Sequence, residues 1–230
     1  MPTSTVEDYL KAIFIHEQPL PRGELVSMGQ IGGTLEVAPG TVTSMVKALE
    51  KDGLVSYSPY AGVRLTEDGR RMALHVLRRH RLIELFLVEV LGLDWSEVHV
   101  EAEHLEHAMS DKLIDRIDAL LGYPSVDPHG DPIPDGQGKL RQPRPAMSLR
   151  ESAGGETYRI ARVSDQDEPF LRFVELHGLK PGTRVTVERR DAVADAVTLR
   201  PQDGDMMTIG GEAAAKLWVE PLDETEPLES

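Results

Sequence analysis

The chain has 230 residues, of which 40% are apolar, so it is long enough for two or three small domains with real cores and is not generally disordered. It has no cysteine, which excludes disulfides, thiolate catalysis and cysteine-based zinc sites, and no long apolar run or basic leader, which predicts a cytoplasmic protein with no membrane partner. The net charge of −14 excludes indiscriminate nucleic-acid binding, because phosphate contacts need local positive charge.

The N-terminal part of the chain predicts three helices followed by a β-hairpin. Apolar residues recur at helical spacing over residues 4–18, 23–35 and 38–52. Residues 54–65 change to a strand-like alternation interrupted by a proline and a glycine, which is typical of a hairpin. This order of elements predicts a winged helix-turn-helix domain over residues 1–70, with the third helix in the DNA major groove.

The start of the third helix is the predicted DNA-reading surface. Val42, Met45, Val46 and Leu49 share one apolar face, so the small residues at the start of the helix are expected to face the DNA. No Arg or Asn is present there for a bidentate base contact, so sequence preference is expected to depend partly on DNA shape. The predicted base-side contacts are Ala38, Pro39, Gly40, Thr41, Thr43 and Ser44, and the predicted backbone contacts are Lys47, Lys51, Tyr57, Tyr60 and Arg64.

Residues 71–135 predict a helical domain that is rich in histidine and carboxylate. Helices are expected from Thr66 to about residue 90, over 95–108 and over 111–121. His99, Glu103, Glu106 and His107 follow one another at steps of four, three and one, so a continuous helix would place them on one face. His80 and Glu84 stand four residues apart on the preceding helix, and Asp8 lies on the first helix. This pattern predicts a metal site, although a solvated acidic face with uninvolved histidines is the alternative.

The C-terminal third changes from linker to β-structure. Residues 136–155 are rich in proline and glycine and predict a linker. Residues 156–221 predict a small barrel domain, and residues 222–230 predict an acidic tail. Within the barrel domain the expected strands are Tyr158–Val163, Arg184–Arg190, Ala196–Arg200 and Met206–Ile209, with helices near 168–177 and over Gly210–Leu217.

Several stretches of this sequence are characteristic of one family. They are VEDYLKAIF (6–14), VAPGTVTSMVKALEKDGLV (37–55), LTEDGRRMA (65–73), RRHRLIELFL (78–87), VHVEAEHLEHAMSD (98–111) and GYPSVDPHGDPIP (122–134). Together they resemble the diphtheria-toxin-repressor family of metal-dependent repressors, and HGLKPGTRVTV (177–187) looks like that family's SH3-like domain. The resemblance implies a mainly α fold with small β parts: a winged helix-turn-helix, a helical metal-binding and dimerisation domain, and a C-terminal SH3-like β-barrel.

The resemblance also implies two metal sites. The primary site would consist of Asp8, Glu103, Glu106 and His107, and the ancillary site would consist of His80, Glu84 and His99. The SH3-like domain would complete the ancillary site, with Asp165, Gln166, Asp167 and Glu168 as candidates, of which Asp165 and Glu168 are retained.

The ligand types favour manganese. Iron-sensing members of the family carry Met and Cys where this chain has Asp8 and Glu103, whereas manganese regulators carry carboxylates there. Hard oxygen ligands favour Mn²⁺, with Fe²⁺ as the other candidate effector and Co²⁺, Zn²⁺ or Cd²⁺ as surrogates. Two-domain manganese regulators have a Glu in place of Lys11, so a close pair of metal ions is not expected here.

The predicted function is a metal-dependent repressor that binds palindromic operators of metal-homeostasis genes as a homodimer. One alternative is a metal-independent winged-helix adaptor whose SH3-like domain binds a proline-rich peptide such as Gln142–Pro145 of the linker. The other is an enzyme with two carboxylate-bound metals, which is disfavoured because only Glu101-Ala-Glu-His104 fits the required Glu-x-x-His pattern. No HExxH, phosphate loop or nucleophile elbow occurs in the sequence, so the chain is predicted not to be an enzyme.

Overall fold

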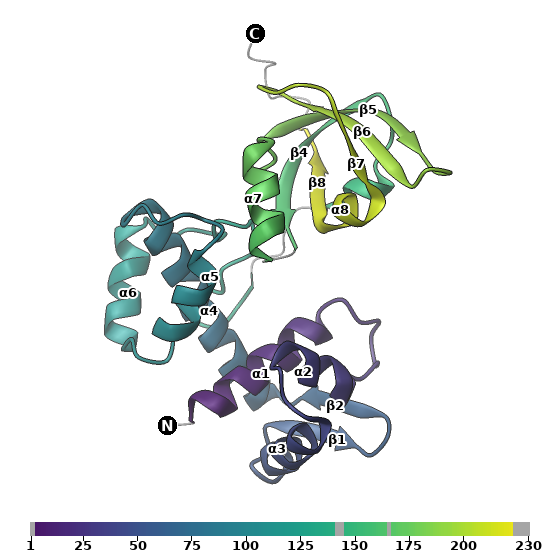
Figure 1. The fold of residues 1–230 in the computed structure, drawn as a ribbon. Helices are drawn as coiled ribbons and strands as arrows, with labels where there is room; N and C mark the ends of the chain where they lie inside the picture. The colour runs from purple at the N-terminus through teal and green to yellow at the C-terminus, as the bar shows by residue number, and fades with distance from the viewer. Residues whose placement is uncertain (1–2, 141–144, 165–166, 223–230) are drawn as a thin grey trace. The chain divides into compact units, whose positions relative to one another are not determined.

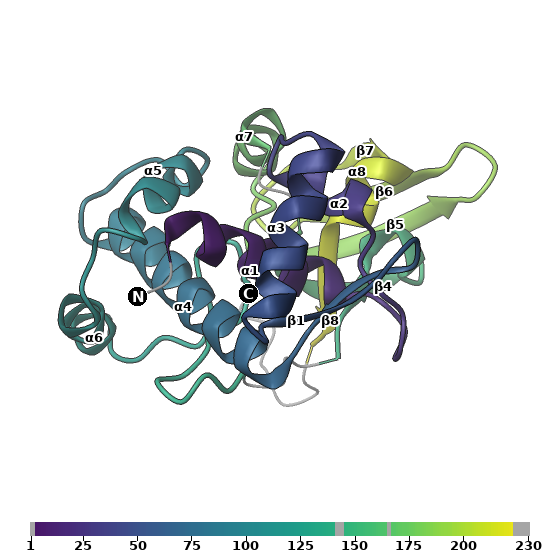
Figure 2. The same ribbon diagram turned by 90° about the horizontal axis from the view of Figure 1, so that it is seen from below.

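The computed structural model describes residues 3–140, 145–164 and 167–222. The chain forms two compact units, each with its own core (Figures 1 and 2). The first unit comprises Met1–His80, Leu105–Ser110 and Pro134–Leu140; the second comprises Arg81–His104, Asp111–Ile133 and Arg141–Ser230. Among the described residues, none of the helices combines the length and apolarity needed to cross a bilayer.

The first helix forms where the apolar periodicity predicts it. Helix α1 spans Ser4–Glu17, and the Thr3 hydroxyl caps it by accepting a hydrogen bond from the Val6 backbone N–H at 3.4 Å. Its apolar face, which includes Leu10, Ile13 and Phe14, is fully buried in the core of the first unit. The start of α1 also carries two acidic residues, Glu7 and Asp8.

The second helix is shorter than the sequence predicted. Helix α2 spans Met28–Thr34, so the prediction of helix from residue 23 is wrong for its first five positions. Val26 instead exchanges two backbone hydrogen bonds of 2.9 Å with Val63, which adds a third strand position to the hairpin. Ser27 and Gln30 then start the helix as a reciprocal capping box.

The third helix and the hairpin confirm the winged helix-turn-helix. Helix α3 spans Pro39–Lys51 with proline in its first turn. Strands β1 (Val55–Ser58) and β2 (Gly62–Leu65) pair antiparallel as the wing. Gly62 has a φ of 139°, and a Cβ there would lie 2.5 Å from the Val26 carbonyl oxygen, so the wing needs glycine at this position.

The helical region has three helices, of which one is shorter than predicted. Helix α4 spans Glu67–Glu89, and the Thr66 hydroxyl accepts the Gly69 N–H at 3.2 Å at its start. Helix α5 spans only Val98–Leu105. Before it, the Asp94 side chain holds residues 94–97 in a turn by accepting the Ser96 N–H at 2.8 Å, and after it residues 106–108 form a turn. Helix α6 spans Asp111–Leu120.

The C-terminal part is a six-stranded antiparallel sheet in the order β3-β8-β4-β5-β6-β7. Four expected strands are present, whereas β8 was not foreseen, and β3 lies inside the segment that was predicted to be linker. Leu149, which follows β3 in the short 3-10 helix η1 (Leu149–Glu151), is fully buried in the core of this sheet. The strands are β3 (Met147–Ser148), β4 (Glu156–Val163), β5 (Arg184–Asp191), β6 (Ala196–Pro201), β7 (Met207–Gly210) and β8 (Leu217–Pro221), and the helices are α7 (Glu168–Leu176) and α8 (Gly211–Lys216).

Within the second unit, the loop after α6 packs directly on strand β4. The Val163 backbone N–H donates to the His129 carbonyl at 2.9 Å. Gly130 has a φ of 86°, and a Cβ there would lie 2.1 Å from the Ala161 carbonyl oxygen. The loop and the strand therefore approach at backbone distance, which only glycine permits.

Candidate metal centre and DNA-binding surface

Three of the four predicted primary ligands converge in the first unit. The ligand atoms of Asp8, Glu106 and His107 all lie within 4.8 Å of one another. Asp8 comes from α1, and the other two come from the turn after α5. The Nε2 atom of His107 lies 2.8 Å from Asp8 Oδ1 and 3.3 Å from Glu106 Oε1. Carboxylate oxygens and an imidazole nitrogen at this separation suit a divalent cation of the Mn²⁺ or Fe²⁺ type.

Glu106 is the most deeply buried member of this cluster. Its side chain is inaccessible to solvent, and both carboxylate oxygens are hydrogen-bonded. Lys11 Nζ donates to Oε1 at 2.6 Å, and His80 Nδ1 lies 2.6 Å from Oε2. A buried carboxylate needs such partners, so Lys11 provides one built-in positive charge beside the cluster.

The protonation preferences of the cluster reflect mutual ion pairing. Burial raises the pKa of Asp8 even though His107 and Lys11 oppose the shift. Burial alone would raise the pKa of Glu106, but His80 and Lys11 bring the net shift below the usual value. Burial would lower the pKa of His107, but Glu7, Glu106 and Asp8 raise it overall. The cluster therefore already balances acidic groups against its own cationic groups.

The remaining predicted ligands lie mostly in the second unit. The prediction of one shared helical face is wrong for Glu106 and His107, since α5 ends at Leu105. On α5, His99 Nε2 lies 3.7 Å from Glu103 Oε1, and His99 Nδ1 lies 3.2 Å from Glu84 Oε1. Glu84 and His99 are thus neighbours, and their assignment to the ancillary site stays a prediction. The assignment of Glu103 to the primary site stays a prediction.

A buried cluster that the sequence reasoning missed lies beside Glu84. The ligand atoms of Glu84, Asp127 and His129 lie within 4.8 Å of one another, and all three residues are buried. Asp127 Oδ2 and His129 Nδ1 have no hydrogen-bond partner within the described part of the chain. Burial, with the nearby Asp131 and Glu84, raises the pKa of Asp127 well above its usual value, and burial lowers the pKa of His129. An imidazole beside two buried carboxylates suits a cation.

The Asp-Pro-His spacing of residues 127–129 was the available signal for this cluster. The geometry depends on the loop fold, in which Asp127 Oδ1 accepts the backbone N–H groups of His129 and Asp131 at 2.8 and 3.0 Å. The Arg81 guanidinium lies 3.4 Å from Asp127 Oδ2 and fixes the same loop. Neither contact can be read from helical periodicity.

Of the predicted ligands from the SH3-like domain, the two that the structure describes, Asp167 and Glu168, belong to none of the candidate metal clusters. Glu168 pairs with Arg172 at 2.7 Å on α7 and is half exposed. Asp167 directly precedes that helix. Asp165 and Gln166 lie outside the described residues. Completion of the ancillary site by this domain stays a prediction.

Most of the residues predicted to contact DNA on the third helix are exposed. Val42, Val46 and Leu49 are buried, as expected. The hydroxyls of Thr43 and Ser44 donate within the helix, to the carbonyls of Pro39 and Gly40, both at 2.9 Å. Because those protons are used internally, the hydroxyl oxygens remain acceptors and the Thr43 methyl suits a thymine methyl. The exposed residues of the predicted set are Ala38, Pro39, Gly40, Thr41, Ser44, Lys47, Lys51, Tyr60 and Arg64, whereas Thr43 and Tyr57 are half-buried.

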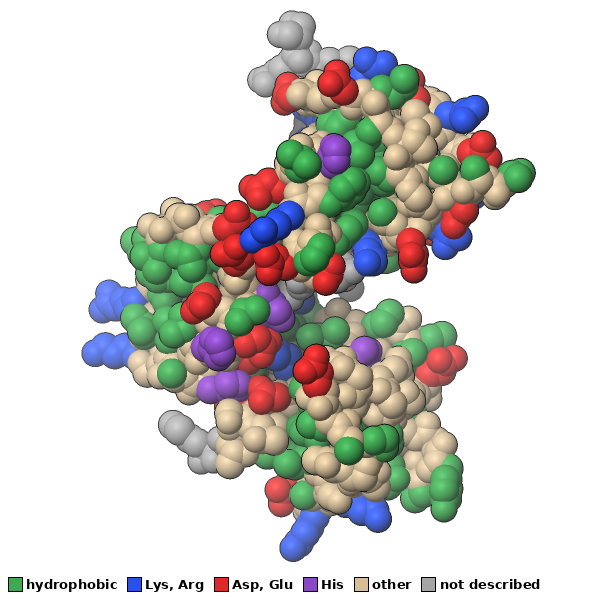
Figure 3. All heavy atoms as spheres, in the orientation of Figure 1, with side chains coloured by type: hydrophobic (Ala, Val, Ile, Leu, Met, Phe, Trp, Pro, Cys, Tyr) green, Lys and Arg blue, Asp and Glu red, His purple; other side chains and the backbone are tan. Residues whose placement is uncertain are grey.

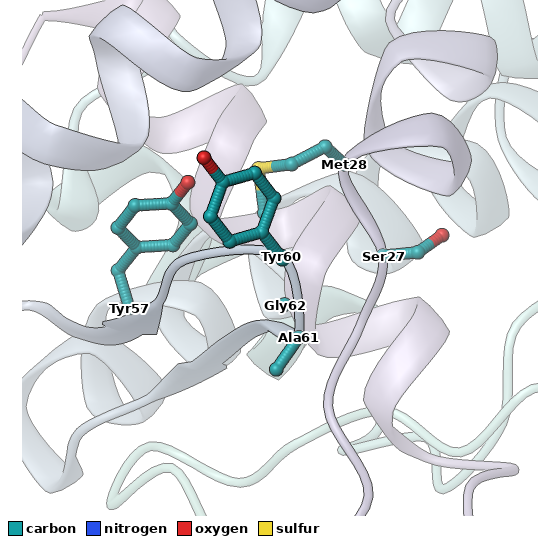
Figure 4. Close-up of a pocket in the computed structure, with 6 residues that line it drawn as sticks. All are labelled: Ser27, Met28, Tyr57, Tyr60, Ala61 and Gly62. Atoms are coloured by element: carbon teal, nitrogen blue, oxygen red, sulfur yellow. The ribbon is translucent and has the colours of Figure 1, made fainter.

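The wing carries a pair of tyrosines beside a shallow pocket of about 250 Å³. Tyr57 and Tyr60 stand next to each other on the hairpin, with Met28 of α2 behind them (Figure 4). Tyr60 is fully exposed at the turn with a φ of 64°. Tyr60 lies at the turn of the wing and Tyr57 lies within β1, opposite Val63. The contact of both tyrosines with the DNA backbone stays a prediction.

Exposed apolar side chains gather beside α6 in the second unit (Figure 3). Leu113 and Leu120 on α6 are 46% and 64% exposed, although Ile114 and Ile117 on the same helix are buried. Val90, Leu91, Tyr123 and Val126 in the adjoining loops are also exposed. Apolar exposure concentrated in one region is typical of an interaction surface.

Comparison with known proteins assigns each region of the chain. Residues 1–63 match the N-terminal DNA-binding domain of iron-dependent repressors, residues 66–135 match their metal-binding and dimerisation domain, and residues 147–221 match the FeoA domain. The chain is 34% identical over 200 residues to the iron-dependent repressor IdeR of Mycobacterium leprae, covering 82% of this chain and 85% of that protein. It is 31% identical over 225 residues to the diphtheria toxin repressor of Corynebacterium efficiens, covering 87% and 96%.

Solved structures agree with these matches. A manganese-dependent transcriptional repressor in complex with manganese superimposes with a TM-score of 0.86 at 41% identity, covering 94% of this chain and 100% of that one. The repressor ScaR with bound Zn²⁺ superimposes with a TM-score of 0.79 at 32% identity, covering 96% and 100%. The alignments extend through all three regions of the chain.

Proposed function

Because this chain belongs to the diphtheria-toxin-repressor family and is a metal-dependent transcriptional repressor, we propose that Mn²⁺ is its effector and that Asp8, Glu103, Glu106 and His107 bind it. The observation that carries this proposal is the convergence of Asp8, Glu106 and His107 within 4.8 Å. These donors are oxygens and one imidazole nitrogen, without sulfur, which favours Mn²⁺ over metals that prefer thiolate. Iron in the names of several relatives keeps Fe²⁺ as the second candidate.

The position of this site explains how metal would control DNA binding. Asp8 belongs to α1, which packs in the same core as α3, the DNA-reading helix. Glu106 and His107 belong to the segment between α5 and α6, within the metal-binding and dimerisation region. Asp8, Glu103 and Glu106 would hold a divalent cation, whose positive charge would offset the repulsion among these three carboxylates. Asp8 would then fix the reading helix relative to the dimerisation region and so select the spacing that matches a palindromic operator.

Lys11 limits the primary site to a single ion. Its Nζ lies 2.6 Å from Glu106 Oε1, so an ammonium already occupies the position where a second cation would share that carboxylate. Like charges at such a distance repel strongly in a buried setting. The ammonium therefore replaces the second member of a metal pair.

The cluster of Glu84, Asp127 and His129 is proposed as the core of the ancillary site, with His99 beside it. The supporting observations are burial of all three residues and the lack of hydrogen-bond partners for Asp127 Oδ2 and His129 Nδ1 in the described residues. His80 stays a predicted ligand, because the contact of its Nδ1 with Glu106 does not exclude coordination through Nε2. Two ions per chain are the expected stoichiometry.

The apolar surface beside α6 is proposed as the homodimer interface. A symmetric interface uses the same patch on both copies, so one substitution introduces a charge from each copy and its effect on the dimer is doubled. Leu120→Asp is expected to weaken the dimer at least about 100-fold, because each copy loses roughly 1.5 kcal/mol of apolar burial. Analytical ultracentrifugation measures the effect, and Val193→Asp, at a fully exposed position in the β5–β6 turn, is the control. A dimer of unchanged strength in Leu120→Asp would place the interface elsewhere.

The proposed effector is tested by operator binding at controlled free metal concentration. Palindromic duplexes are first selected from random DNA with the Mn²⁺-loaded protein, and their affinity is then measured with Mn²⁺, Fe²⁺, Co²⁺ and Zn²⁺. We expect Mn²⁺ to increase affinity by roughly 5- to 150-fold, the range that ordinary coupling energies give. Activation by Fe²⁺ alone would contradict the manganese assignment, and the lack of a response to all four metals would contradict the whole proposal.

A further inference from the structure

His107 is held from both sides of its ring. Nε2 faces Asp8 Oδ1 at 2.8 Å and Glu106 Oε1 at 3.3 Å, which are the proposed metal ligands. Nδ1 faces the opposite way and lies 2.6 Å from Glu7 Oε2. Glu7 is outside the converging ligand set, so the two ring nitrogens have different surroundings.

The Glu7 carboxylate is itself fixed in place. Its side chain is only 13% exposed, and its other oxygen, Oε1, lies 3.9 Å from Arg79 Nη1 on α4. A carboxylate on α1, paired with an arginine on α4, thus reaches the ring of a histidine that lies 100 residues further along the chain. An acidic residue that served only solubility would not be buried between two partners.

A histidine can bind a metal ion only through a ring nitrogen with a free electron pair. Which nitrogen has it depends on the hydrogen bond that the other nitrogen makes. A carboxylate accepts but does not donate, so without metal Nδ1 donates to Glu7 and Nε2 donates to Asp8. A cation held by Asp8 and Glu106 would take the place of the Nε2 proton, whereas Glu7 would retain the proton on Nδ1.

We propose that Glu7 is a positioning residue of the metal centre, which fixes the tautomer and orientation of His107 without binding the metal. The inference rests on the proposed primary site and extends it by one residue. Partners of this kind contribute roughly 10- to 100-fold to metal affinity in metalloproteins. No sequence signal identified Glu7, because it lies beside the ligand Asp8 and has no helical spacing to the other ligands.

The test compares Glu7→Ala with Glu7→Gln in the full-length protein, with Mn²⁺ affinity measured by isothermal titration calorimetry. Glu7→Ala is expected to bind Mn²⁺ roughly 10- to 100-fold more weakly. Glu7→Gln keeps an oxygen that accepts from Nδ1–H, so it should recover a large part of that loss. Glu17→Gln is the matched control, since Glu17 also pairs an α1 carboxylate with an α4 arginine, Arg70, at 2.7 Å, and its affinity should equal that of the unmodified protein.

Nitrogen-15 NMR of the Zn²⁺-loaded protein reads the ring directly. The expected result is a protonated Nδ1 and a metal-bound Nε2 in His107. Unchanged affinity in Glu7→Ala, or a metal-bound Nδ1, would overturn the inference. Equal losses in Glu7→Gln and Glu7→Ala would also overturn it, because Glu7 would then be a ligand. If Asp8→Ala instead keeps full metal affinity, the primary site itself is misassigned, so the two failures are distinguishable.

Discussion

Asp8→Ala is expected to abolish the stimulation of operator binding by Mn²⁺. Asp8 is the ligand that α1 contributes to the cluster, and its Oδ1 lies 2.8 Å from His107 Nε2. Without it, a cation can still bind Glu106 and His107, but it no longer connects the reading helix to the dimerisation region. The whole coupling, on the order of 1–3 kcal/mol or roughly 5- to 150-fold in affinity, is then lost.

A mobility shift titrated with Mn²⁺ measures this loss. Asp68→Ala is the control, because Asp68 is an exposed acidic residue of the same unit that pairs with Arg71 in its own helix, at 3.0 Å. Glu103→Ala tests the fourth proposed ligand in the same assay. Retention of full metal dependence by Asp8→Ala would remove the basis of the proposed mechanism.

Lys11→Met is expected to destabilise the metal-free protein by about 3–5 kcal/mol, the usual effect of removing one partner of a buried ion pair. Lys11 is 7% exposed and Glu106 is inaccessible, so water cannot replace the lost ammonium. His80 still contacts the other oxygen of Glu106 at 2.6 Å, which keeps the loss within this range. Metal should recover part of the stability, since it supplies a positive charge to the same carboxylate.

Urea unfolding with and without Mn²⁺ measures both effects. Lys47→Met, at an exposed position of α3, should change the free energy of unfolding by no more than about 0.5 kcal/mol. A loss below about 1 kcal/mol in Lys11→Met would show that Glu106 does not depend on the ammonium. Metal binding by Lys11→Met with one additional ion per chain would further support the role of Lys11 in limiting the site to one metal.

The sequence predicted those parts of the fold that depend on local pattern. Helices α1, α3 and α4 have clear apolar periodicity and caps, and the wing has strand alternation around a turn. Helix α2 was extended too far because Leu25 and Val26 fit a helical pattern, whereas the backbone of Val26 pairs with Val63, 37 residues away. Such a long-range contact leaves no local signal.

The metal chemistry was predictable, but its exact arrangement was not. The density of imidazole and carboxylate side chains indicated a metal site, and the resemblance to a known family indicated that Asp8 is one of its ligands. The early end of α5 divides the histidine-rich stretch between two units, which periodicity alone does not reveal. Asp127 and His129 are brought to Glu84 by a loop whose conformation depends on Arg81 and on its own backbone hydrogen bonds.

The close approach at Gly130 couples any movement of the loop over residues 127–131 to strand β4. No side chain cushions the contact, and the His129 carbonyl is bonded to the Val163 N–H at 2.9 Å. Asp127 and His129 therefore cannot shift toward a ligand without moving strand β4, an inner strand of the sheet. The SH3-like domain therefore constrains the position of the buried cluster of Glu84, Asp127 and His129.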